Sequence, residues 1–142
     1  MQTIHCDSSV LFDYGSLRNL LNNRIVRSGQ FKVVVSPFAL AEVYAKVRDN
    51  EDVVNRVHGL LISNEIEVFM FNGDSWKLFM EYLNELMSEV NWLGLYDVLI
   101  VATALADANA KYFVTLDRNI IQSNKVKELF KRHNPKLEFL EL

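Results

Sequence analysis

The sequence has few residues that cross-link or interrupt a chain. Its only cysteine is Cys6, which excludes an internal disulfide framework and a cysteine-based zinc site. A single cysteine fits a reducing cytoplasmic setting, and we expect Cys6 to be a small buried strand residue. Only 2 prolines and 5 glycines occur among 142 residues, and there is neither a repeat nor a low-complexity linker. These absences favour one continuous domain over residues 1–142.

A large net charge and long apolar runs are also missing. The net charge of −3 excludes a strongly basic domain that binds nucleic acid by bulk attraction, so such binding would need a local basic patch. The longest strongly apolar stretch, residues 98–106, is too short to span a bilayer, and no signal-peptide pattern opens the chain. We therefore expect a soluble, cytoplasmic protein that makes no membrane contact.

Several enzyme classes lack their motifs in this chain. The three histidines are not at metal-ligand spacing, and there is no G-x-S-x-G elbow, glycine-rich dinucleotide turn or P-loop. A phosphoacceptor receiver domain needs paired acids after its first strand, whereas Asp7 is followed by two serines. Acyl transfer, cofactor-dependent chemistry and a receiver function therefore rank low.

Hydrophobic periodicity predicts an alternation of strands and helices. Short β-branched and aromatic runs predict strands at residues 3–6, 31–35, 65–71, 112–116 and 137–140. Helices are expected at residues 10–25, 37–48, 52–63, 76–90 with a cap at Asp74 and Ser75, 95–108, and 124–133. The alternation predicts a three-layer α/β/α fold with a mainly parallel central sheet.

Two of the expected helices are unusually apolar. Residues 95–108 are apolar nearly all round, which predicts a central, buried helix. Residues 76–90 carry an apolar stripe that we expect to be core, although a dimer face or a groove for an inhibitory helix is the alternative. The stripe consists of Trp76, Phe79, Met80, Leu83, Leu86, Met87 and Val90.

Four acidic residues fall where an α/β fold binds its ligands, outside the carboxyl ends of the strands. Asp7 and Asp117 follow expected strands, Asp97 opens the central helix, and Glu42 lies less than two turns into its helix. Each aspartate also has an ordinary explanation as a cap or first-turn residue, but Glu42 has none. Four adjacent carboxylates would repel one another unless Mg²⁺ or Mn²⁺ held them ionised.

The segments 7–11, 41–43, 96–105 and 115–117 resemble, in order and spacing, the motifs of PIN-domain ribonucleases. The resemblance is closest to the toxin component of VapBC-type toxin–antitoxin pairs. It implies a PIN-like fold and a Mg²⁺- or Mn²⁺-dependent endoribonuclease whose metal site is formed by Asp7, Glu42, Asp97 and Asp117. It also implies a homodimer that an antitoxin protein silences.

The resemblance further implies roles for two hydroxyl residues, Ser9 and Thr115. The alternatives are a helix cap for Ser9 and a strand-end hydrogen bond for Thr115. The first strand departs from the family, because His5 and Cys6 stand where the family has a more uniformly aliphatic run.

An RNA substrate would also need cations from the protein. Arg118, beside Asp117, is expected to reach a phosphate, and the basic helix at residues 124–133 is a candidate patch. Its cations are Lys125, Lys127, Lys131 and Arg132, for which a solvated helix face is the alternative. Two other functions stay open, namely a non-cleaving PIN-like scaffold and a housekeeping RNA-processing nuclease. The acids alone do not distinguish RNA from DNA.

Overall fold

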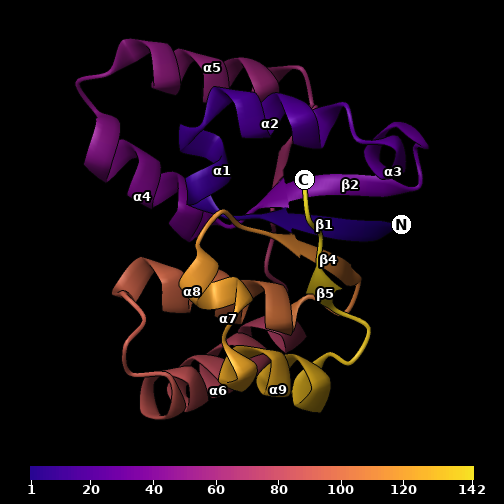
Figure 1. The fold of residues 1–142 in the computed structure, drawn as a ribbon, viewed down its shortest axis with the longest axis vertical. Coiled ribbons are helices and arrows are strands. Elements are labelled where there is room, and N and C mark those ends of the chain that lie inside the picture. The colour runs from indigo at the N-terminus through magenta and orange to yellow at the C-terminus, as the bar shows by residue number, and fades with distance from the viewer.

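The computed structural model describes residues 1–142 and contains a five-stranded sheet between two helical layers (Figure 1). The strand order is β3-β2-β1-β4-β5, and every neighbouring pair is parallel. The strands are β1 (Gln2–Cys6), β2 (Phe31–Val35), β3 (Glu67–Val68), β4 (Ala110–Val114) and β5 (Glu138–Phe139). The expected three-layer α/β/α architecture is confirmed, and the sheet is parallel throughout.

The helices divide between the two faces of the sheet (Figure 1). One face carries α1 (Ser8–Phe12), α2 (Tyr14–Leu21), α4 (Pro37–Val47) and α5 (Glu51–Ile62), and the short α3 (Arg24–Arg27) leads into β2. The other face carries α6 (Gly73–Glu89), α7 (Leu95–Ala106) and α9 (Asn124–His133), while α8 (Arg118–Ile121) is a single turn after β4. No helix is long and apolar enough to cross a membrane.

The centre of the core is α7, as its composition predicts. Val98 and every residue from Ile100 to Ala106 are buried, and α7 packs against both α6 and α4. Cys6 is buried in β1, also as expected. The helix ends at Ala106, two residues before the predicted end, because the extended backbone of Asp107 forms its C-cap.

The helix expected at residues 10–25 is wrong, because three short helices occupy this region. Asp13 has an extended backbone that separates α1 from α2, and the Asn23 side chain caps α3. Both residue types compete with helical hydrogen bonding through their short polar side chains.

Several other boundaries differ from the prediction. The strand expected at residues 112–116 is β4, which begins and ends two residues earlier, and the strand expected at residues 137–140 contains only Glu138 and Phe139. The strand expected at residues 65–71 contains only Glu67 and Val68, because Phe71 turns into an aromatic cluster with Phe38 and Phe79. The following helix begins earlier than expected, since Asn72 forms a capping box with Ser75.

The apolar stripe of α6 is only partly core. Phe79, Leu86 and Val90 are buried as predicted, and Leu83 packs against the core. Trp76, Met80 and Met87 are 45%, 59% and 56% exposed, so the core assignment is wrong for these three. The reason is that α6 turns Phe79 and Leu86, together with Tyr82, into the protein, which leaves the neighbouring side of the helix at the surface.

The strand order creates a switch point beside β1. The chain runs outward from β1 to β2 and β3, and then returns to place β4 on the opposite side of β1. Parallel α/β sheets bind ligands at the carboxyl ends of the two strands where the order reverses. Asp7 directly follows β1, and Thr115 to Asp117 directly follow β4.

Candidate acidic site

Asp7 is the most enclosed acid of the chain's candidate site, at 2% exposure. Its Oδ1 accepts the Ser8 backbone N–H at 2.9 Å, so Asp7 is indeed the N-cap of α1. Its Oδ2 accepts the hydroxyls of Ser9 at 2.9 Å and Thr115 at 2.7 Å. Burial raises the pKa of Asp7 and the Glu42 charge adds to this rise, although the three hydrogen bonds oppose it.

Glu42 joins Asp7 through the side chain between them. The Ser8 hydroxyl donates to Glu42 Oε1 and lies 3.5 Å from Asp7 Oδ1. Glu42 Oε2 accepts from the Lys46 ammonium at 2.6 Å, one turn along α4. Glu42 is 4% exposed, so this helix residue is buried without any capping role, as its sequence surroundings predict. Lys46 supplies the cation that a buried carboxylate needs.

Asp97 projects from the first turn of α7 toward the same acids. Its pKa is raised from 3.8 to about 6, first by burial and then by the charges of Asp7, Glu42 and Asp117. Lys46 opposes this rise, and the pKa of Lys46 is itself raised by its hydrogen bond to Glu42 and by nearby acid charges. All three other acids raise the pKa of Asp97, so their charges lie within electrostatic range of it.

Asp117 is held at the rim by the same hydroxyl that binds Asp7. Its backbone N–H donates to Thr115 Oγ1 at 3.0 Å, and its Oδ1 accepts the Asn119 N–H at 2.9 Å. Asp117 is therefore the N-cap of α8 as well as a member of the cluster. Ser9 Oγ accepts the Leu116 N–H at 3.0 Å, which ties the start of α1 to the end of β4.

The donor chemistry of the cluster fits a hard divalent cation, since every side chain that converges here except Lys46 offers oxygen. In the present arrangement, no three His, Cys, Asp or Glu side chains form a ready metal-binding group. Both Asp7 oxygens instead accept hydrogen bonds, and Glu42 bonds to Ser8 and Lys46. Binding a metal would therefore require the Glu42 and Lys46 side chains to rearrange.

The predicted cations separate into two groups. Lys125 pairs with Glu128 at 3.5 Å, and Arg132 pairs with Glu85 and Glu89, so their charges are already offset. The other three, Arg118, Lys127 and Lys131, are exposed and form no ion pair. Arg118 and Thr115 line one small cavity of about 160 Å³. Lys127 and Lys131 line a larger one beside α9.

Two contacts of the site were missed in the sequence. Ser8 reads as turn chemistry, yet its hydroxyl links two of the acids. Lys46 lies four residues after Glu42, a spacing that brings opposite charges together on a helix and was the available signal.

The partner of His5 in β1 was also not predicted. His5 is buried and its Nε2 lies 2.8 Å from Asp107 Oδ2, so the side chain has a structural partner away from the acids.

Comparison with known proteins gives one family match for the chain. The family model of the PIN domain matches residues 4–126 of the chain. No curated protein matches the chain in sequence.

Solved structures with the same fold cover nearly all of the chain. Similar chains occur in VapBC2 from Rickettsia felis bound to a DNA fragment from its promoter, at a TM-score of 0.63, 19% identity and coverage of 98% of this chain and 99% of that one. For VapBC-1 from nontypeable Haemophilus influenzae the TM-score is 0.62 and the identity is 16%. The match covers 98% of this chain and 97% of that one. A third similar chain occurs in VapBC-5 from Mycobacterium tuberculosis, a member of the VapBC family of toxin–antitoxin systems. Its TM-score is 0.58, its identity is 15%, and the match covers 100% of both chains.

Proposed function

Because the chain belongs to the PIN domain family, we propose that it is a Mg²⁺- or Mn²⁺-dependent endoribonuclease and the toxin of a toxin–antitoxin pair. The observation that carries this proposal is the cluster of four acids at the switch point of the sheet. Two of them, Asp7 and Glu42, are almost fully enclosed. A protein gains nothing in stability from such a cluster, so its composition is better explained by a cation that binds there.

The residues of the cluster would have different roles in binding the metal. Asp7 and Asp97 are our candidates for direct ligands, with Glu42 and Asp117 binding directly or through water. The Thr115 and Ser9 hydroxyls orient the Asp7 carboxylate, in the way that outer groups orient ligands in metal sites. A divalent cation bound by these residues would activate water and neutralise charge on the phosphate. Arg118 carries no ion pair and lines a cavity together with Thr115, which supports a contact with a neighbouring phosphate.

The activity is tested by incubating purified protein with single-stranded RNA and either Mg²⁺ or Mn²⁺. We expect cleavage that chelation abolishes and that the Asp97→Asn variant lacks, with its fold checked by circular dichroism. RNA binding without metal-dependent cleavage, across structured and unstructured substrates, would instead establish a non-cleaving scaffold. A matched DNA oligonucleotide separates ribonuclease from deoxyribonuclease activity, because phosphate-binding acids do not read the 2′-hydroxyl.

The proposed antitoxin partner is supported by the likeness to chains found in VapBC complexes. The test is co-expression with the protein encoded beside this gene. A complex that copurifies and suppresses cleavage supports the toxin role. A cleaving protein with no such neighbour is a housekeeping nuclease.

We also propose a homodimer, formed through the exposed apolar side of α6. Trp76, Met80 and Met87 are exposed on the same helix, and a contiguous exposed apolar patch marks an association surface. The Trp76 ring stacks on Phe71 with a centroid distance of 4.2 Å, so it is presented as a fixed flat surface.

A further inference from the structure

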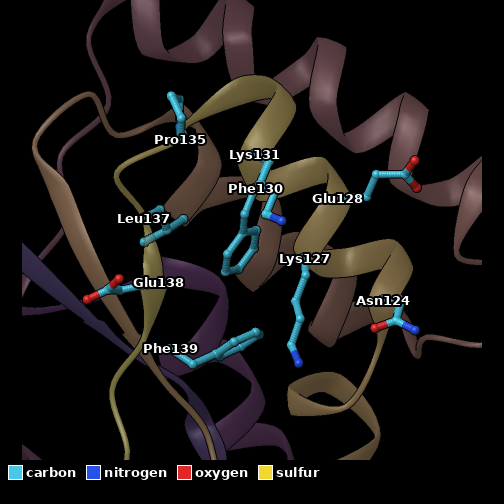
Figure 2. Close-up of a pocket in the computed structure, with 9 residues that line it drawn as sticks. All are labelled: Asn124, Lys127, Glu128, Phe130, Lys131, Pro135, Leu137, Glu138 and Phe139. Carbon is cyan, nitrogen blue, oxygen red and sulfur yellow. The ribbon is translucent and has the colours of Figure 1, made fainter.

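The largest cavity of the protein lies away from the acids, between α9 and the edge strand β5 (Figure 2). Its volume is about 700 Å³, which is within the range of small-ligand pockets. Phe130, Leu137 and Phe139 point into it and form an apolar floor. The Phe130 and Phe139 rings are 5.1 Å apart, but Phe130 is only 3% exposed, so Phe139 supplies most of the aromatic surface that a ligand could reach.

Two lysines and two glutamates line this cavity, and only the lysines lack an ion pair. Figure 2 shows Lys127 and Lys131 leaning over the cavity from α9, while Glu128 and Glu138 point away from it. The two acids pair with other lysines, Glu128 with Lys125 at 3.5 Å and Glu138 with Lys111 at 3.6 Å. Lys127 and Lys131 have no acidic partner, and one helical turn separates them. The cavity therefore offers two free ammonium groups above an aromatic floor.

A second cavity shares lining residues with both regions. Its lining includes Thr115, which bonds to Asp7, and Arg118. It also includes Phe139, which lines the large cavity as well, and Glu141 and Leu142 at the C-terminus. The smaller cavity therefore contacts both the acidic site, through Thr115, and the α9–β5 cavity, through Phe139.

We propose that the α9–β5 cavity is a nucleotide subsite for the RNA strand on one side of the cleavage point. This inference rests on the proposed nuclease function and deepens it. A nucleotide combines a flat base with an anionic phosphate, which matches an aromatic floor below two unpaired cations. An apolar side chain of a protein partner would match the floor, but would leave both ammonium groups without an anion.

The proposal predicts a dependence on substrate length. A strand of about 12 nucleotides should reach the subsite and one of about 4 should not, given the usual site sizes of single-strand binding surfaces. We expect the Lys127→Gln/Lys131→Gln variant to raise KM for the longer RNA about tenfold and to leave its kcat within about twofold, which removes the advantage of the longer strand. Two lost phosphate contacts should also reduce the slope of log affinity against log salt by about 1.4.

A charge-matched control is Arg24→Gln/Lys77→Gln, which removes two exposed cations elsewhere that have no ion pair. The milder Phe139→Leu variant keeps an apolar residue in the floor and should also weaken the longer RNA selectively. Equal KM values for the lysine variant and the control would overturn the subsite, and so would equal losses on both RNA lengths. A variant that keeps its RNA kinetics but loses the antitoxin complex would reassign the cavity to the protein partner. Wild-type protein that cleaves neither RNA refutes the nuclease itself, a distinct result.

Discussion

In the absence of metal, the acidic site should lower the free energy of unfolding of the protein, and Asp97 offers the clearest test. Its pKa is raised from 3.8 to about 6 by burial and by the charges of the other acids. Below pH 3.8 it is protonated in both the folded and the unfolded protein, so it has no effect on stability. Above about pH 6 it is ionised in both states, and the folded state carries the full electrostatic penalty.

The size of this penalty follows from the shift in pKa. The difference between 3.8 and about 6 corresponds to at most about 3 kcal/mol. Solvent screening at this half-buried carboxylate reduces the figure to about 1–2 kcal/mol. We therefore expect Asp97→Asn to raise the free energy of unfolding by about 1–2 kcal/mol at pH 7.5 in EDTA, and to change it little at pH 3.5. The melting temperature at pH 7.5 should rise by about 3–8 °C.

The measurement is urea unfolding and calorimetry at both pH values, with and without metal. Saturating Mg²⁺ or Mn²⁺ should stabilise the wild type, by about 2.7 kcal/mol at 100 times the dissociation constant, and the variant much less. Asp49→Asn, at an exposed acid after α4, serves as the control. A variant that is less stable than wild type in EDTA at pH 7.5, or a gain that does not depend on pH, would refute the reasoning.

Three further outcomes are expected. Lys46→Met should tighten Mg²⁺ binding about fivefold, because the Lys46 ammonium competes with the metal for Glu42. Calorimetric titration at low salt measures this affinity, and unchanged or weaker binding would contradict the prediction. Burial raises the pKa of Asp107, but hydrogen bonds from His5 and Thr3 outweigh it and lower this pKa overall. Its contribution to stability should therefore be present above pH 3.8 and lost as the pH falls further, so Asp107→Asn should flatten the fall in unfolding free energy below pH 4 in acid titrations. Trp76→Glu should convert the proposed dimer to a monomer in light scattering, without loss of helix content.

The fold was largely predictable because its signals are local. The β-branched run of β2 and the apolar composition of α7 have no other stable interpretation in a chain of this length, and both elements form as expected. The Ser36–Pro37 start of α4 is likewise chemistry between adjacent residues. The helix boundaries at Asp13 and Asn72 were predicted wrongly. Several polar residues near each position could cap the helix, and the sequence alone does not show which of them does so.

The acids could be placed at one edge, but their connections could not be predicted. That Thr115 binds Asp7 across 108 positions depends on the register of β1 against β4, which includes an irregularity between Thr3 and Ile4. The basic patch shows the same limit. Its lysines look alike in sequence, and only the fold shows that Glu128 offsets Lys125 while Lys131 stays unpaired.

The charge of the site also predicts the order in which its ligands bind. The acids of the site outnumber Lys46, the one cation that pairs with them, so the metal-free site should repel an incoming phosphate. A bound divalent cation would offset this negative charge, so RNA should bind weakly before the metal and more tightly after it. Lys127 and Lys131 lie outside the cluster, and their contribution should remain in the absence of metal. RNA binding measured in EDTA should therefore still be weakened by the lysine variant. The effect of Asp97→Asn on RNA binding should instead depend on the metal. With metal present the substitution should weaken RNA binding, and without metal it should strengthen binding, because it removes one repelling charge.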